Sequence, residues 1–104
     1  MARVKHVVLV RFMAEIPSDT IADLFAALGN LRQTIPGLLD FSWGVNISTE
    51  GLAKGFTHGF VMTFADEASR DGYLPHPDHE AVKARILPWI EGGAAGVVIV
   101  DWAE

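Results

Sequence analysis

The spacing of hydrophobic positions changes along the first part of the chain, and each spacing predicts one element. Residues 4–12 alternate between two faces, which is typical of a β-strand. Apolar side chains then recur at helical spacing over residues 21–35, and the helix is expected to end at the Pro36-Gly37 pair. Ser18 precedes this run and is a residue type that caps helix N-termini, so we expect it at the N-cap.

The remaining pattern predicts three more strands and a helical region in two pieces. Residues 41–48 and 56–64 are strand-like, and the polar segment between them, which contains two glycines, predicts a hairpin loop. Asp66 begins a short helical piece. A second helix, expected over residues 77–90 with Pro88 bending its end, begins with a proline, whose fixed φ and missing N–H suit a first helical turn. After a glycine-rich joint, residues 97–102 predict the last strand.

The resulting order, β-α-β-β-α-β, is that of ferredoxin-like α+β folds. Right-handed crossovers place both helical regions on one face of a four-stranded antiparallel sheet, within a single domain of residues 1–104. On the last strand Val98, Val100 and Trp102 share the face opposite Val97, so the strand is apolar on both sides. A monomer would leave one such face in water, and we therefore expect a homodimer that packs through the sheet faces.

Composition and charge exclude several classes of protein. Half of the 104 residues are apolar and a fifth are charged, which is ordinary for a globular protein. The net charge of −5 lacks the basic character of nucleic-acid-binding proteins. Without cysteine there is no disulfide framework, thiolate metal site or cysteine nucleophile. His6 and Arg11 interrupt the first apolar run, which is too short to span a membrane, and we expect a cytoplasmic protein with no membrane partner.

Residues 71–79, DGYLPHPDH, hold the only tyrosine and two of the four histidines. His79 lies in the first turn of the helix that begins at Pro77, where the helix dipole disfavours imidazolium and should lower the pKa, so that a neutral ring could act as a general base. The intervening turn could fold the Tyr73 hydroxyl towards the same space, where it could bind a carbonyl oxygen that gains negative charge. For His76, a role in the turn is the simpler interpretation.

Two further histidines lie on strand faces that are otherwise apolar. His6 shares a face with Val8, and His58 shares one with Phe60, so both point into the interior if the helices cover those faces. A purely structural interpretation stays open for each of them, as a hydrogen-bonded core histidine or an edge residue. The same holds for Tyr73, whose ring could pack while its hydroxyl is solvated.

Other kinds of site have weaker support. His76 and His79 with Asp78 nearby could begin a zinc site, yet no third ligand is close in sequence, so no metal is expected. The glycines before the last strand do not join a strand to a helix and fit no phosphate-binding pattern, so no nucleotide cofactor is expected. Trp89 is expected to wall the core or a ligand pocket.

Five segments together carry a family resemblance, and they are VKHVVLVRF, IPGLLDFSWG, GFTHGFVMTF, YLPHPDH and VVIVDW. The joint presence of the first-strand histidine, THGF and HPxH is specific for the stress-responsive A/B barrel (Dabb) family of dimeric α+β barrels. The chain resembles this family over nearly its whole length. The resemblance implies a ferredoxin-like fold and a homodimer.

Within this family the chain is similar to polyketide cyclases that perform an aldol condensation. The similarity implies a cofactor-free mechanism in which His79 removes a proton from an activated methylene and Tyr73 holds the carbonyl oxygen as an enolate develops. It implies that His6 and His58 orient a small apolar or polyketide-like ligand. Leu28 stands where the cyclase has a tyrosine that shapes its alkyl-tail pocket, so the resemblance leaves the substrate open.

Two other functions also stay open. Many members of the family have no established reaction, so the chain could be a non-catalytic dimeric module that binds an apolar ligand or resists stress. Related α+β barrels include haem-degrading monooxygenases, which is a third hypothesis.

Overall fold

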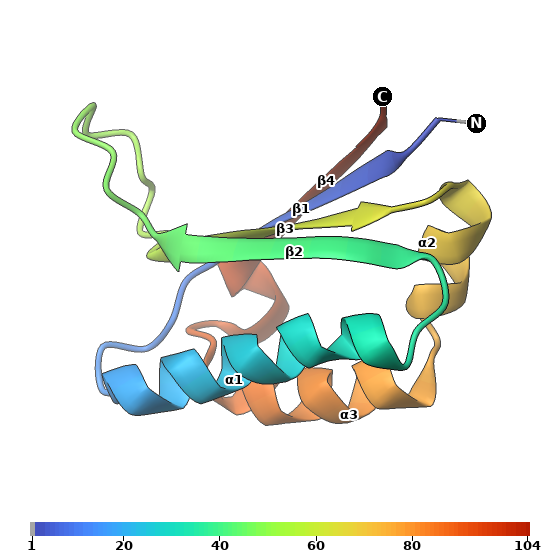
Figure 1. Ribbon diagram of the computed structural model, residues 1–104. Helices are drawn as coiled ribbons and strands as arrows, with labels where there is room; N and C mark the ends of the chain where they lie inside the picture. Colours follow the sequence, from blue (N-terminus) through green and yellow to red (C-terminus); the bar gives the residue numbers. More distant parts are fainter. Residues whose placement is uncertain (1) are drawn as a thin grey trace.

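The computed structural model describes residues 2–104. Four strands form one antiparallel sheet in the order β2-β3-β1-β4, and the helices lie on one of its faces (Figure 1). The elements in chain order are β1 (Val4–Val10), α1 (Ser18–Asn30), β2 (Leu38–Val45), β3 (His58–Phe64), α2 (Glu67–Tyr73), α3 (Pro77–Ile86) and β4 (Val97–Ala103). The predicted ferredoxin-like βαββαβ order is confirmed.

Short 3₁₀ helices follow two of the α-helices and precede the last strand, at Leu31–Gln33, Leu87–Trp89 and Gly93–Gly96. The helix expected over residues 77–90, with Pro88 bending its end, is an α-helix to Ile86 and a 3₁₀ helix from there to Trp89, since Pro88 has no N–H to continue the α-helical hydrogen bonds. The prediction of Ser18 as N-cap is wrong. Pro17 occupies that position with extended backbone angles, and no side chain caps the helix.

The register of the sheet decides which side chains meet. His6 on β1 lies opposite Met62 of β3 on one side and Asp101 of β4 on the other. His58 lies opposite Val10. The two strand histidines are therefore separated by four positions along β1, which is roughly 13 Å at the usual rise of a strand.

The core lies between the inner face of the sheet and the helices. Met62 and Phe64 of β3 are completely buried, as expected for this apolar strand, and Tyr73 at the end of α2 is 1% exposed. Phe25 of α1 stacks on Trp43 of β2 with their ring centroids 4.4 Å apart. Aromatic packing therefore closes the β2 side of the core.

The outer face of the sheet has no helix over it (Figure 1). Leu9, Val98, Val100 and Trp102 stand on this face, and the last two are 53% and 51% exposed. The predicted apolar character of both faces of β4 is confirmed. None of the helices within residues 2–104 has the length and apolar character needed to cross a membrane.

Candidate active site

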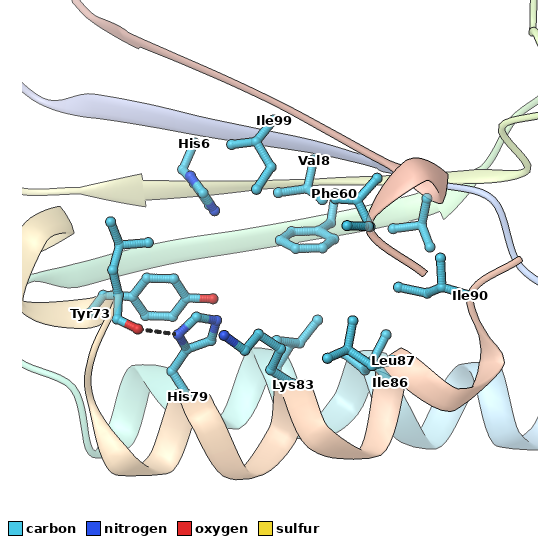
Figure 2. A pocket seen from close by; sticks show the side chains of 15 residues that line it. His6, Val8, Phe60, Tyr73, His79, Lys83, Ile86, Leu87, Ile90 and Ile99 are labelled. Atoms are coloured by element: carbon cyan, nitrogen blue, oxygen red, sulfur yellow. Dashed lines mark hydrogen bonds between the residues drawn. The ribbon is translucent and has the colours of Figure 1, made fainter. Parts of the chain in front are cut away.

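A cavity of about 350 Å³ lies between α3 and the inner face of β1 and β4, with a volume in the range of small-molecule sites (Figure 2). Its polar lining residues are His6, Tyr73, His79 and Lys83. Apolar side chains make up the remainder of the wall and come from strands, helices and the segment before β4: Val8, Val10, Leu28, Phe60, Leu74, Ile86, Leu87, Ile90, Ala94, Val97 and Ile99. The arrangement is an apolar chamber with a few polar groups.

The turn between α2 and α3 brings Tyr73 and His79 to this cavity. His76 is the N-cap of α3, and its Nδ1 accepts a hydrogen bond from the Asp78 N–H at 3.1 Å. Pro77 follows as the first helical residue. Tyr73 ends α2 and His79 is the third residue of α3, so a short, capped turn fixes their relative position. The structural role predicted for His76 agrees with this placement.

The rings of Tyr73 and His79 stack, with centroids 4.0 Å apart and an interplanar angle of 26°. Figure 2 shows the Tyr73 hydroxyl directed into the cavity above His79. His6 completes a row of rings, because it contacts Tyr73 edge-on at 5.8 Å. Of the three histidines and the tyrosine expected to converge, His6, Tyr73 and His79 line this one cavity and His58 does not.

A backbone hydrogen bond selects the tautomer of His79. Its Nδ1 lies 3.0 Å from the Leu74 carbonyl oxygen. Because a carbonyl can only accept, Nδ1 carries the proton, and Nε2 of the neutral ring is left as a proton acceptor. Burial lowers the pKa of His79, and the nearby Lys83 charge acts in the same direction. The predicted direction of the shift thus holds, but burial rather than the helix dipole is its main cause.

Burial has the opposite effect on the phenol. It raises the pKa of Tyr73, because the ionised phenolate would be poorly solvated in the core. Tyr73 is therefore a hydrogen-bond donor at neutral pH and not a base. The pair offers one acceptor, at His79 Nε2, and one donor, at the Tyr73 hydroxyl.

A chain of charged groups holds His6. Its Nδ1 lies 2.8 Å from Asp101 Oδ1, and the other oxygen of that carboxylate accepts a hydrogen bond from Arg70 at 2.8 Å. Arg70 also donates to Asp71 at 2.9 Å. An ionised carboxylate accepts from Nδ1–H, so Asp101 turns the Nε2 side of His6 to the cavity.

Two residues expected to contact the ligand lie away from this cavity. His58 packs against Phe12 with centroids 5.2 Å apart and borders a separate hollow beside the hairpin loop. The register places it several positions from His6, which explains the separation. Trp89 packs against the core from the 3₁₀ turn after α3 but is not part of the cavity wall. Leu28, by contrast, does line the cavity.

The histidine pair considered for zinc binds the backbone instead. Nδ1 of His76 accepts from the N–H of Asp78, and Nδ1 of His79 donates to the Leu74 carbonyl. Within residues 2–104 no group of three or more His, Cys, Asp or Glu side chains is arranged to hold a metal ion.

With this geometry the chain can be placed among known proteins. Residues 4–104 match the model of the stress responsive A/B barrel domain. The chain belongs to this family. The family resemblance predicted from the five sequence segments is confirmed.

Two relatives of this stress-responsive A/B barrel protein are named in different ways, one for its domain and the other for a reaction. The stress-response A/B barrel domain-containing protein HS1 of Arabidopsis thaliana is 31% identical over 99 residues, which cover 95% of this chain and 87% of HS1. Olivetolic acid cyclase of Cannabis sativa is 30% identical over 76 residues, which cover 73% of this chain and 75% of the cyclase. The cyclase is a relative named for an enzymatic reaction, whereas HS1 is named for its domain.

A solved structure shares the fold over almost the full chain. It is a dimeric ferredoxin-like protein of unknown function from Jannaschia sp. CCS1, with a TM-score of 0.86 and 31% identity, covering 96% of this chain and 97% of that chain. This structural neighbour of the A/B barrel protein is dimeric.

Sequence reasoning missed three side chains near the site. Asp101 and Arg70 hold His6, and Lys83 lines the cavity. Asp101 was detectable as the single acid within an apolar strand, but its partner depends on the strand register. Lys83 was detectable from its spacing, because it follows His79 by one helical turn.

Proposed function

We propose that this A/B barrel protein is a cofactor-free catalyst of proton transfer and aldol-type ring closure on polyketide or other β-dicarbonyl compounds. The observation that carries the proposal is the stacked pair of Tyr73 and His79 at the wall of an apolar cavity. The hydrogen bond of His79 to the backbone uses Nδ1, so Nε2 remains for a substrate. The similarity to olivetolic acid cyclase adds support.

The proposed reaction uses the pair as base and donor. Nε2 of His79 takes a proton from the methylene between two carbonyl groups, and the C–H electron pair moves into an enolate whose oxygen accepts from the Tyr73 hydroxyl. The enolate carbon forms a bond to a second carbonyl carbon of the same molecule. The oxygen at that carbon then takes the proton back from His79, which restores the neutral ring. His6 would orient the substrate at the same end of the cavity.

We also propose that two copies assemble through the uncovered sheet face. Val98, Val100 and Trp102 of β4 form its apolar part together with Leu9 of β1. Burying such side chains is worth roughly 1.5–3 kcal/mol each when burial is complete. The dimeric structural neighbour supports this assembly.

The test of the catalytic proposal is a ring-closure assay. Purified protein is mixed with tri- and tetraketide acids and thioesters, and cyclised product is measured by chromatography against buffer alone. We expect His79→Ala to lower the rate at least roughly a hundredfold, because the base is lost. Tyr73→Phe keeps the stacked ring but removes the donor, with an expected loss of roughly a hundredfold or more.

A matched control comes from the same turn. His76→Asn removes a histidine three positions from His79 and keeps a side chain suited to the N-cap, so its rate should stay close to that of the unchanged protein. Equal rates for the unchanged protein, His79→Ala and Tyr73→Phe would exclude the mechanism.

A non-catalytic apolar-ligand-binding module is the second candidate, favoured by the predominantly apolar wall of the cavity. It predicts that ligands bind with similar affinity to His79→Ala and to the unchanged protein, and that none of the dicarbonyl compounds is converted.

A further inference from the structure

The polar groups of the cavity include one permanent cation. Lys83 follows His79 by four residues on α3, so the two side chains share one helix face. Figure 2 shows the Lys83 side chain among the cavity-lining residues on the same side as His79, and its charge adds to burial in lowering the pKa of that histidine. A ligand group bound by His79 and Tyr73 would therefore lie close to a full positive charge.

The rest of the chamber offers no place for a second charged group. Beyond the polar end the wall is formed by aliphatic and aromatic side chains such as Val8, Leu28, Phe60, Ile90 and Val97. A charged atom deep among them would lose its hydration without a partner. A fitting ligand thus has a polar head at one end and an apolar body.

We propose that Lys83 makes this cavity selective for ligands with an anionic head, of the class of medium-chain carboxylic acids. The carboxylate would lie beside the Lys83 amine, with the carbon chain in the apolar part, and the Tyr73 hydroxyl would stay free to donate to the enolate oxygen. The inference rests on the proposed function in taking this cavity as the substrate site. The inference adds that the substrate binds preferentially as the free acid rather than as a neutral ester or amide.

The present partner of Lys83 does not prevent this. Its amine donates to Glu80 Oε1 at 3.0 Å, and the two side chains are 46% and 47% exposed. Exposed ion pairs at this helical spacing contribute little, because water competes for both charges. A carboxylate at the cavity end is less hydrated and forms a charge-assisted hydrogen bond, so it competes well for the amine.

The volume of the cavity limits the length of the ligand. About 350 Å³ accommodates on the order of a dozen non-hydrogen atoms, if each takes roughly the 30 Å³ of a liquid water molecule. Octanoate fits this limit. Octanamide has the same shape and the same number of non-hydrogen atoms without the charge, so the pair isolates the effect of the anionic group.

The experiment measures binding of octanoate and octanamide by titration calorimetry at neutral pH. We expect the unchanged protein to bind octanoate about tenfold more tightly, which is the usual effect of a hydrogen bond to a charged group. Lys83→Met should remove this preference and leave octanamide binding unchanged, whereas Lys83→Arg should keep it. Arg85→Met, which removes a cation from an exposed position of the same helix, should keep it too.

Several results would overturn the inference. They are equal affinity for octanoate and octanamide in the unchanged protein, binding of neither compound, or an undiminished preference in Lys83→Met. Because only binding is measured, a protein that prefers octanoate but converts no dicarbonyl substrate would refute the proposed catalysis and leave the anionic selectivity standing. A protein that closes rings but binds both compounds equally would do the reverse.

Discussion

At the scale of single residues, burial prepares the two functional groups for opposite roles. It lowers the pKa of His79 and raises that of Tyr73, so the imidazole is neutral and the phenol is protonated near pH 7. Stacking keeps the two rings in contact without pairing the hydroxyl with Nε2. A base and a donor in the required protonation states thus lie side by side at one wall.

The shift of His79 predicts the acid side of the pH profile. Because burial disfavours imidazolium, the midpoint of the His79 titration lies below 6.5, the ordinary pKa of histidine. We expect kcat/KM for ring closure to fall on the acid side with a midpoint below that pH. Initial rates of product formation across the acid range check this. Tyr73→Phe should lower the rate without moving the acid limb, and a limb above pH 6.5 would contradict the assignment.

The hydrogen bond between Asp101 and His6 leads to a second prediction, on the rate of the reaction. Asp101→Asn keeps the shape of the side chain but removes the charge that holds His6 Nδ1–H and Arg70. We expect kcat to fall roughly tenfold or more with a smaller change in KM, which is the usual cost of removing an orienting partner. The ¹⁵N chemical shifts of the His6 ring should report a change of tautomer population.

The control for Asp101 is the other carboxylate on the same arginine. Asp71→Asn removes the exposed partner of Arg70 and leaves the bond to His6 in place. Its kcat and the His6 shifts should stay as in the unchanged protein. Equal losses in the two variants would show that Asp101 acts through stability alone.

The candidate site was predictable from the sequence where its residues are close along the chain. Tyr73 and His79 are joined by a five-residue segment whose prolines and capping histidine restrict it, so their convergence follows from local rules. Asp101 is 95 positions from His6, and only the strand register brings them together. The family resemblance placed His58 in the same pocket, whereas the shared sheet face predicted only that it points inward and did not specify its position along the strand.

At the scale of elements, the spacing of apolar residues predicted the type and order of the helices and strands better than their boundaries. The strand predicted over residues 41–48 is Leu38–Val45, a shift of three residues. The helix expected over residues 77–90 is α-helical only to Ile86, because Pro88, where a bend was expected, interrupts the hydrogen bonds. The 3₁₀ segments matter for the site, since they lead the chain from α3 back to β4 and supply part of the cavity wall.

The 3₁₀ segment Gly93–Gly96 predicts a position that tolerates no side chain. A Cβ at Gly96 would collide with the Glu91 carbonyl oxygen and lie 2.6 Å from Cγ2 of Ile90. We expect Gly96→Ala to lower the free energy of unfolding by about 2–3 kcal/mol, because overpacking forces neighbours to move. Urea denaturation measures the change. Octanamide binding should weaken as well, since Ile90 lines the cavity.

Gly72→Ala serves as the control for this overpacking. A Cβ at Gly72 of α2 meets no atom within 4 Å, and alanine favours a helical backbone. The free energy of unfolding should rise by up to about 0.5 kcal/mol. A loss in Gly72→Ala, or none in Gly96→Ala, would show that the segment before β4 adapts more freely than its contacts indicate.

At the scale of the whole molecule, the sheet is apolar on both faces, but the helices cover only one of them (Figure 1). The other face is left without a covering layer. On this face, β1 and β4 present Leu9, Val98, Val100 and Trp102 outwards. Ile99 of the same strand lines the cavity. Because the two faces alternate residue by residue along β4, packing of a second copy would also fix the strand that forms one wall of the site.

This arrangement predicts how a single charge would affect the assembly. Val100→Asp places a carboxylate on the outer face, and two-fold symmetry brings two of them into one apolar interface. We expect the dissociation constant of the dimer, measured by sedimentation equilibrium, to rise roughly a hundredfold or more. Ala26→Asp introduces the same charge at an exposed position of α1 and should leave the constant unchanged. A dimer equally stable in both variants, or an unchanged protein that is monomeric at micromolar concentration, would show that the sheet face is not the interface.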